Sequence, residues 1–131
     1  MNGARIDSEY KIPLDTLRNL KLSKNSEIHI VSAGPSIKNY DWKKLRQKDV
    51  MTINDALFYL PVKTMYHVYN EPTEQQLFNY YRASKFLHLQ KFTTFNIPGW
   101  HQLSLYQGEN LAFQLAINVS IDLGYKKAFL Y

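Results

Sequence analysis

A short turn carries the residues best suited to holding an anion. Gly34-Pro35-Ser36 directly follows residues 28–33, an apolar run rich in β-branched side chains. Glycine lets a ligand approach the main chain closely, and serine offers a hydroxyl and a backbone N–H to a phosphate or ribose. The segment matches neither a Walker A loop nor the glycine-rich dinucleotide fingerprint. Alone it is only a turn, but its place after a buried strand makes it a candidate nucleotide-binding loop.

Two asparagines stand at the ends of the next two predicted strands. Asn54 ends the strand at residues 50–54, and Asn70 follows the strand at residues 63–69. Because the carboxyl ends of parallel strands share one edge of a sheet, both amides are expected beside Gly34. An amide has a donor and an acceptor and therefore suits sugar hydroxyls and base edges. Each asparagine is also an ordinary turn residue, and their common register favours a binding site.

Gly108-Glu109-Asn110 is predicted to open the longest helix of the chain. The free N–H groups of its first turn would make a second anion cradle at the same edge of the sheet. The alternative is that Gly108 and Asn110 are simply good helix-start residues. Both interpretations stay open.

No catalytic set stands out. The chain has no cysteine, which excludes thiol nucleophiles, disulfides and cysteine-based zinc sites. His29 and His67 fall in predicted strands, and His88 and His101 have no partner at zinc-ligand spacing. His101, beside Trp100, is the one histidine that merits a test as an acid or base. The sequence thus predicts no metal site and leaves the catalytic residues unknown.

Strand patterns alternate with helix patterns, which predicts βαβ crossovers and a mainly parallel sheet. Strands are expected at residues 28–33, 50–54, 63–69, 92–95 and 127–131. Helices are expected at residues 13–20, 41–47, 71–88 and 108–123. The predicted fold class is α/β, a Rossmann-like domain with helices on both faces of the sheet.

Apolar spacing predicts which side of each helix faces the core. The positions concerned are Trp42 and Leu45 after an Asp41 N-cap, then Leu77, Tyr80, Tyr81 and Phe86, then Leu111, Leu115, Val119 and Leu123 before a Gly124 C-cap. The aromatic run that includes Phe78 is interpreted as core and not as a stacking platform. Asp55 is either a helix cap or a ribose or metal contact.

Residues 1–25 are predicted to be an N-terminal extension with a short helix, and residues 26–131 a single nucleotide-binding domain. The last predicted strand ends at the C-terminus, where a ligand-binding loop would normally follow. We therefore expect a domain truncated after its last strand, either a fragment or a minimal version of a larger protein.

The charge balance favours an anionic partner, because 16 Lys and Arg outnumber 11 Asp and Glu for a net charge of +5. These basic residues are scattered, whereas nucleic-acid binders concentrate them on one stripe with aromatics. A small anionic ligand is therefore expected, and no specific nucleic acid. No signal peptide or transmembrane-length apolar run is present, which predicts a cytoplasmic chain. Peripheral membrane association and homo-oligomerisation through an open sheet edge stay open.

Several of these segments resemble bacterial sialyltransferases of the family that makes lipooligosaccharide outer cores. They are also similar to a wider group of Rossmann proteins, those like 6-hydroxymethylpterin diphosphokinase, common in bacteria and phages. The segments that carry the resemblance are residues 30–37, the strand through Asn54, residues 69–72 and residues 123–130. The similarity runs from about residue 27 to the C-terminus and covers only the N-terminal part of the family.

The resemblance implies nucleotide contacts from Gly34, Ser36, Asn54 and Asn70, with residues 108–110 near a CMP-sugar donor. Where the sialyltransferases carry an asparagine near the Gly-Pro-Ser loop, this chain has serine and alanine, which removes one amide contact. The family also continues into a Gly-x-Asp motif and a histidine base that are not in this sequence.

The predicted function is a nucleotide- or nucleotide-sugar-binding domain, the donor-binding part of a sialyltransferase-like glycosyltransferase. An enzyme could equally be a diphosphokinase-like transferase. The alternative is a non-catalytic nucleotide- or protein-binding module of the pterin-diphosphokinase-like group, which phages also encode.

Overall fold

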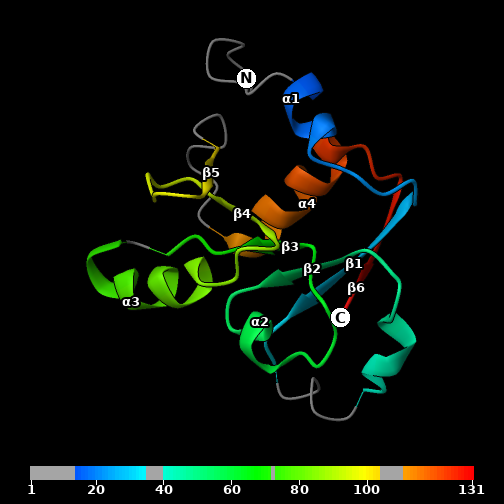
Figure 1. The fold of residues 1–131 in the computed structure, drawn as a ribbon, viewed down its shortest axis with the longest axis horizontal. Helices are drawn as coiled ribbons and strands as arrows, with labels where there is room; N and C mark the ends of the chain where they lie inside the picture. The colour runs from blue at the N-terminus through cyan, green and yellow to red at the C-terminus, as the bar shows by residue number, and fades with distance from the viewer. Residues whose placement is uncertain (1–13, 35–39, 72, 104–110) are drawn as a thin grey trace.

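The structure is a computed structural model that describes residues 14–34, 40–71, 73–103 and 111–131. Within these ranges, six strands form one parallel sheet in the order β5-β4-β3-β2-β1-β6 (Figure 1). The strands are β1 (Glu27–Ser32), β2 (Val50–Ile53), β3 (Tyr66–Val68), β4 (Gln90–Thr93), β5 (His101–Gln102) and β6 (Lys127–Leu130). The helices are α1 (Leu14–Asn19), the 3₁₀ helix η3 (Trp42–Leu45), α2 (Ala56–Tyr59), α3 (Thr73–Ser84) and α4 (Ala112–Leu123). The predicted α/β, Rossmann-like class is confirmed.

Helices cover both faces of the sheet. On one face α4 and α1 pack over alternate strand residues that include Ile30, Met51 and Val68. On the other face lie η3 and α2, over Val31 and Val50, and α3 lies farther along the same face. Since the central strands are covered on both sides, all described residues of β2 and β3 are buried and their burial does not alternate.

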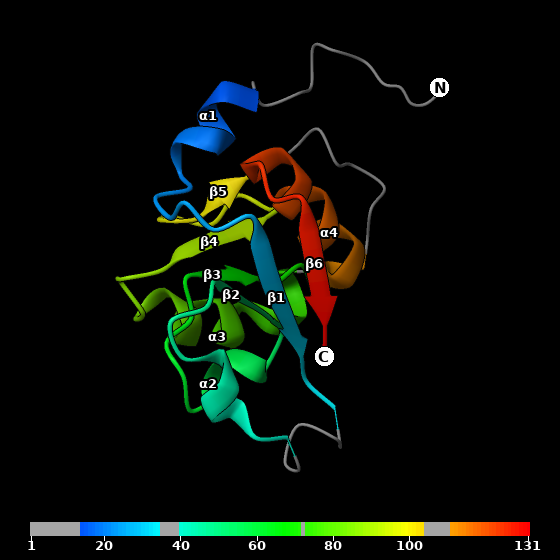
Figure 2. The same ribbon diagram turned by 90° about the vertical axis from the view of Figure 1, so that its right-hand side faces the viewer.

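The strand order reverses between β1 and β6. From β1 to β5 each new strand adds to the same side, and β6 then returns to pair with the other side of β1. Figure 2 shows these two strands side by side, running in the same direction. In open α/β sheets, ligands bind outside the carboxyl ends of the strands at such a reversal. In this chain the reversal lies beside Ser32, Ala33 and Gly34.

Helix α4 confirms most of its predicted pattern. Leu115, Val119 and Leu123 are buried, and Gly124 caps the helix in the left-handed conformation, with φ at 105°. The predicted start is wrong, however, because the helix begins at Ala112 and not at residue 108. Leu111 has an extended backbone just outside the helix and is 68% exposed, so it does not face the core as predicted.

Helix α3 buries only one of its two apolar sides. Tyr80 and Ala83 are buried against the sheet, but Leu77, Phe78 and Tyr81 are 60–70% exposed, which contradicts their predicted core positions. The physical reason is the rotation of about 100° per residue, which turns these three residues about 60–160° around the helix from Tyr80, on the side away from Ala83. A single layer of helix over the sheet cannot bury both sides.

The remaining differences concern short elements. The segment predicted as a helix at residues 41–47 is the 3₁₀ helix η3, whose Asp41 cap accepts a hydrogen bond from the backbone N–H of Lys43. Strand β4 begins at Gln90, two residues earlier than expected. Helix α2 and strand β5 were not predicted at all. Strand β5 holds only two residues and joins β4 through its backbone, so it has no apolar pattern of its own.

Candidate functional site

Asn54 lies immediately after β2 at the carboxyl edge of the sheet. Its backbone is in the left-handed region, with φ at 56°, and its N–H donates to the carbonyl oxygen of Val68 at 3.1 Å. The side-chain Oδ1 is buried, and no donor within the described part of the chain reaches it. A buried acceptor left without a donor costs about 1–3 kcal/mol. An unpaired buried acceptor at the predicted ligand-binding edge is typical of a group whose hydrogen-bond donor is supplied by a ligand.

Asn70 lies two residues after β3, one position beyond the match of Asn54, because Ile53 pairs with Val68. The two asparagines therefore do not share the predicted register. Its Oδ1 accepts hydrogen bonds from the Thr93 hydroxyl at 3.1 Å, from the Thr94 backbone N–H at 2.7 Å and from the Thr94 hydroxyl at 2.8 Å. The residue is only 5% exposed. Asn70 therefore stands at the predicted edge and ties the end of β3 to the loop after β4. Its contact with a nucleotide stays a prediction.

Gly34, two residues after β1, has no heavy atoms close to its Cα on the side where a Cβ would point. A Cβ added there would meet no heavy atom within 4 Å, and the backbone is outside the left-handed region. Neither packing nor backbone conformation among the described residues therefore requires a glycine, which leaves close approach of a ligand as a physical role for it. The other predicted contacts, Pro35, Ser36, Gly108 and Asn110, lie outside the described residues.

An aromatic cluster borders the reversal point on the face of the sheet that η3 covers. The Tyr131 ring lies 5.1 Å from that of Tyr40 and 5.9 Å from that of Trp42, measured between centroids. On its other side, its hydroxyl is 2.8 Å from His29 Nδ1, and the His29 ring stacks on Phe129 at 4.9 Å. Burial raises the pKa of Tyr131 to about 12 and lowers that of His29. No local sequence signal predicted this cluster, because its residues come from three separate segments.

The other two described histidines of the sheet are bonded inside it. Nδ1 of His67 lies 2.9 Å from the hydroxyl of Thr52, and burial lowers the pKa of His67 to about 3, so its ring is neutral. Nε2 of His101 lies 2.7 Å from the side-chain oxygen of Gln90, and burial again lowers the pKa. In the part of the chain that the structure describes, no three metal-ligating side chains gather.

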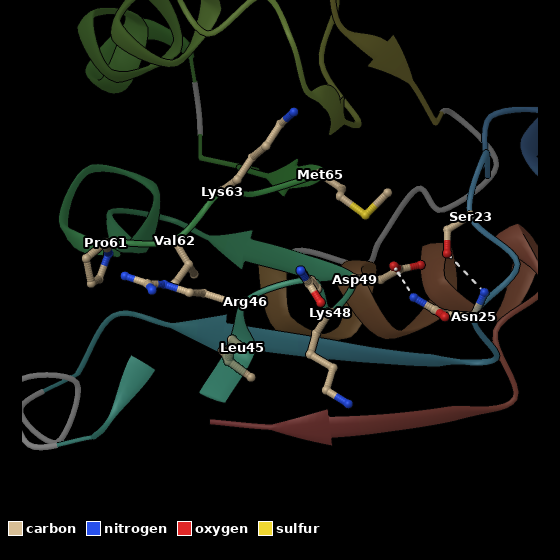
Figure 3. Close-up of a pocket in the computed structure, with 11 residues that line it drawn as sticks. Ser23, Asn25, Leu45, Arg46, Lys48, Asp49, Pro61, Val62, Lys63 and Met65 are labelled. Carbon is tan, nitrogen blue, oxygen red and sulfur yellow. Dashed lines mark hydrogen bonds between the residues drawn. The ribbon is translucent and has the colours of Figure 1, made fainter. Parts of the chain in front are cut away.

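A cavity of about 510 Å³ lies at the opposite, amino edge of the sheet (Figure 3). Asp49 on its wall accepts hydrogen bonds from the Asn25 amide and the Tyr125 hydroxyl, so its carboxylate serves the fold. The cationic side chains on the wall diverge: Figure 3 shows Lys48 and Lys63 pointing to opposite sides. These cations do not converge on one point. The cavity also lies at the edge of the sheet opposite Asn54.

No protein-family model matches this chain, and no curated protein or solved structure matches it either. The resemblance to sialyltransferases and pterin diphosphokinases therefore stays a prediction. Among the described helices, none is both long and apolar enough to cross a membrane.

Proposed function

We propose that the carboxyl edge of β1 and β2 binds a nucleotide or a nucleotide sugar. The observation that carries the proposal is the buried side-chain oxygen of Asn54, which has no donor among the described residues and follows a left-handed backbone. A ribose hydroxyl or an exocyclic base amine would supply the missing donor. Binding would then recover the cost that the free protein bears at this residue.

The surroundings of Asn54 support the same class of ligand. The strand order reverses beside the Gly34 loop, which is where α/β sheets bind their ligands. Gly34 leaves room for a phosphate or sugar to approach the main chain. The net charge of +5 favours an anionic ligand over a neutral one.

Within this proposal, the domain holds the CMP-sugar donor of a sialyltransferase-like glycosyltransferase. The resemblance assigns the catalytic base to a segment after the final strand, so the residues described here would bind and orient the donor. Orienting a donor is itself a large part of catalysis, because it replaces a bimolecular encounter with a fixed geometry.

The second candidate is a module that binds a nucleotide or protein partner without turnover. The bonding of the histidines favours it: His29, His67 and His101 each pair with another side chain, and burial lowers the pKa of all three. A histidine held neutral in this way is a poor general acid at neutral pH.

The site can be mapped by NMR titration of isotope-labelled protein with CMP, UMP and AMP. We expect the side-chain amide of Asn54 to shift with at least one nucleotide, and that of the exposed Asn96 to stay in place. Movement of Asn96 without Asn54 would contradict the proposed site. Incubation with CMP-sialic acid separates the two candidates, because reproducible release of CMP by the purified chain would reject a module without turnover.

A further inference from the structure

The exposed side of α3 forms a strip of apolar and basic side chains. We call Leu77, Phe78, Tyr81, Arg82 and Lys85 the outer strip. Leu77, Phe78 and Tyr81 are 62%, 70% and 60% exposed. By helical rotation these three residues fall within an arc of about 100°. The opposite side of the helix is already buried against the sheet, so the fold does not need these apolar groups.

The two cations of the outer strip lie against aromatic rings. The Arg82 guanidinium is 3.9 Å from the ring centroid of Phe58 and 5.7 Å from that of Phe78. Lys85 Nζ is 4.9 Å from the centroid of Tyr81. These contacts hold positive charge beside exposed apolar surface.

Helix α3 lies at the outer rim of the molecule (Figure 1). We propose that the outer strip docks this protein onto the surface of an anionic lipid bilayer. Phenylalanine, tyrosine and leucine flanked by lysine and arginine are the composition of helices that lie in a membrane interface. The long cationic side chains would reach the headgroups while their stems and the rings enter the acyl boundary.

Charge complementarity favours a bilayer over a second copy of the chain. Two copies of the chain, each with a net charge of +5, repel each other. An anionic leaflet instead attracts basic residues placed near its surface. This proposal is independent of the nucleotide site, because it rests on α3 and not on the edge at Asn54.

Flotation of the full chain with lipid vesicles tests the proposal. We expect binding to vesicles of phosphatidylcholine mixed with phosphatidylglycerol, weaker binding to pure phosphatidylcholine, and loss of binding at high salt. Removing both charges in the double variant Arg82→Gln, Lys85→Gln should lower the partition coefficient about thirtyfold. The matched control is Lys126→Gln, Lys127→Gln, two exposed lysines before and in β6.

The apolar part is tested by Leu77→Ser, Phe78→Ser. Its control is Leu111→Ser, Ile121→Ser, which removes two leucine-sized groups of similar exposure, 68% and 59%, in and beside α4. We expect the first pair to abolish flotation and the control to keep it, with nucleotide binding unaffected and all variants folded. Arg82→Gln loses its contact with the Phe58 ring and should unfold at a slightly lower temperature.

Three results would overturn the proposal. The first is a wild-type chain that does not bind anionic vesicles, or that binds pure phosphatidylcholine vesicles as well as anionic ones. The second is an equal loss of binding in the control pairs. The third is either a dimer in light scattering that the α3 substitutions abolish, or binding of a single-stranded oligonucleotide, without vesicle binding, that the same substitutions abolish. Either form of the third result would assign the strip to a different occupant.

Discussion

The side-chain oxygen of Asn70 accepts two hydrogen bonds from Thr94, one from its backbone N–H at 2.7 Å and one from its hydroxyl at 2.8 Å. One strand away, the side-chain oxygen of Asn54 is buried and accepts none from the described residues. Two asparagines, one directly after β2 and the other two residues after β3, therefore differ in their hydrogen bonding. Asn70 contributes to the fold through these bonds, whereas the buried oxygen of Asn54 costs free energy in the free protein.

Asn70→Ala is expected to destabilise the protein by about 3 kcal/mol, because three hydrogen bonds end on the oxygen that it removes. Urea denaturation measures the change. Asn96→Ala, at an exposed position, should stay within about 0.5 kcal/mol of the wild type. Equal stability of the two variants would show that Asn70 does not hold the loop after β4.

Asn54→Gly is expected to stabilise the free protein by about 1 kcal/mol, because it removes a buried acceptor that no described residue reaches with a donor and suits the left-handed backbone. Thermal and urea unfolding, without ligand, measure the difference. A clear loss of stability would show that the Asn54 amide contributes to the fold, and the strongest argument for a binding role would then fail.

Gly34→Val is expected to keep the stability of the wild type within about 0.5 kcal/mol, because the new side chain meets open space and no positive φ. Nucleotide affinity should nevertheless fall, since the side chain would occupy the room that a ligand needs. Gly99→Val is a useful contrast. Its φ of 85° disfavours any L side chain, so this variant should lose about 1 kcal/mol or more of stability. An unchanged nucleotide affinity in Gly34→Val would show that the loop at Gly34 does not contact the nucleotide.

The stability of the protein should fall as the pH drops below 6.5, the ordinary pKa of histidine. Burial lowers the pKa of folded His67 to about 3, so between pH 6.5 and 3 the unfolded chain binds the proton that the folded chain refuses. His67 alone should account for a loss of about 2 kcal/mol at pH 5 relative to neutral pH. Denaturation of the wild type and of His67→Gln at several pH values compares the two slopes. Equal slopes would show that His67 is protonated as easily folded as unfolded.

Much of the frame of the sheet was predictable from local patterns. Strands β1 and β2 are apolar β-branched runs, and Leu115, Val119 and Leu123 mark the buried side of α4 by their spacing. Gly124 was predictable as a cap because few other residues adopt its left-handed backbone cheaply.

The remaining features depend on tertiary contacts that local patterns do not carry. Spacing along α3 shows two apolar sides but not which of them meets the sheet, and so Tyr81 was wrongly placed in the core while Tyr80 was placed correctly. The difference between Asn54 and Asn70 arises from Thr94, which follows a different strand. Likewise, the cluster around Tyr131 exists only because β6 returns to the side of β1.

Isothermal titration calorimetry of the wild type and of Asn54→Gly with CMP, UMP and AMP tests the central claim most directly. We predict that the wild type binds at least one of these nucleotides, and that Asn54→Gly binds it at least about tenfold more weakly, a loss of about 1.4 kcal/mol, although it is the more stable protein. Equal affinity of the two proteins, or no binding of any nucleotide by the wild type, would contradict a nucleotide site at Asn54.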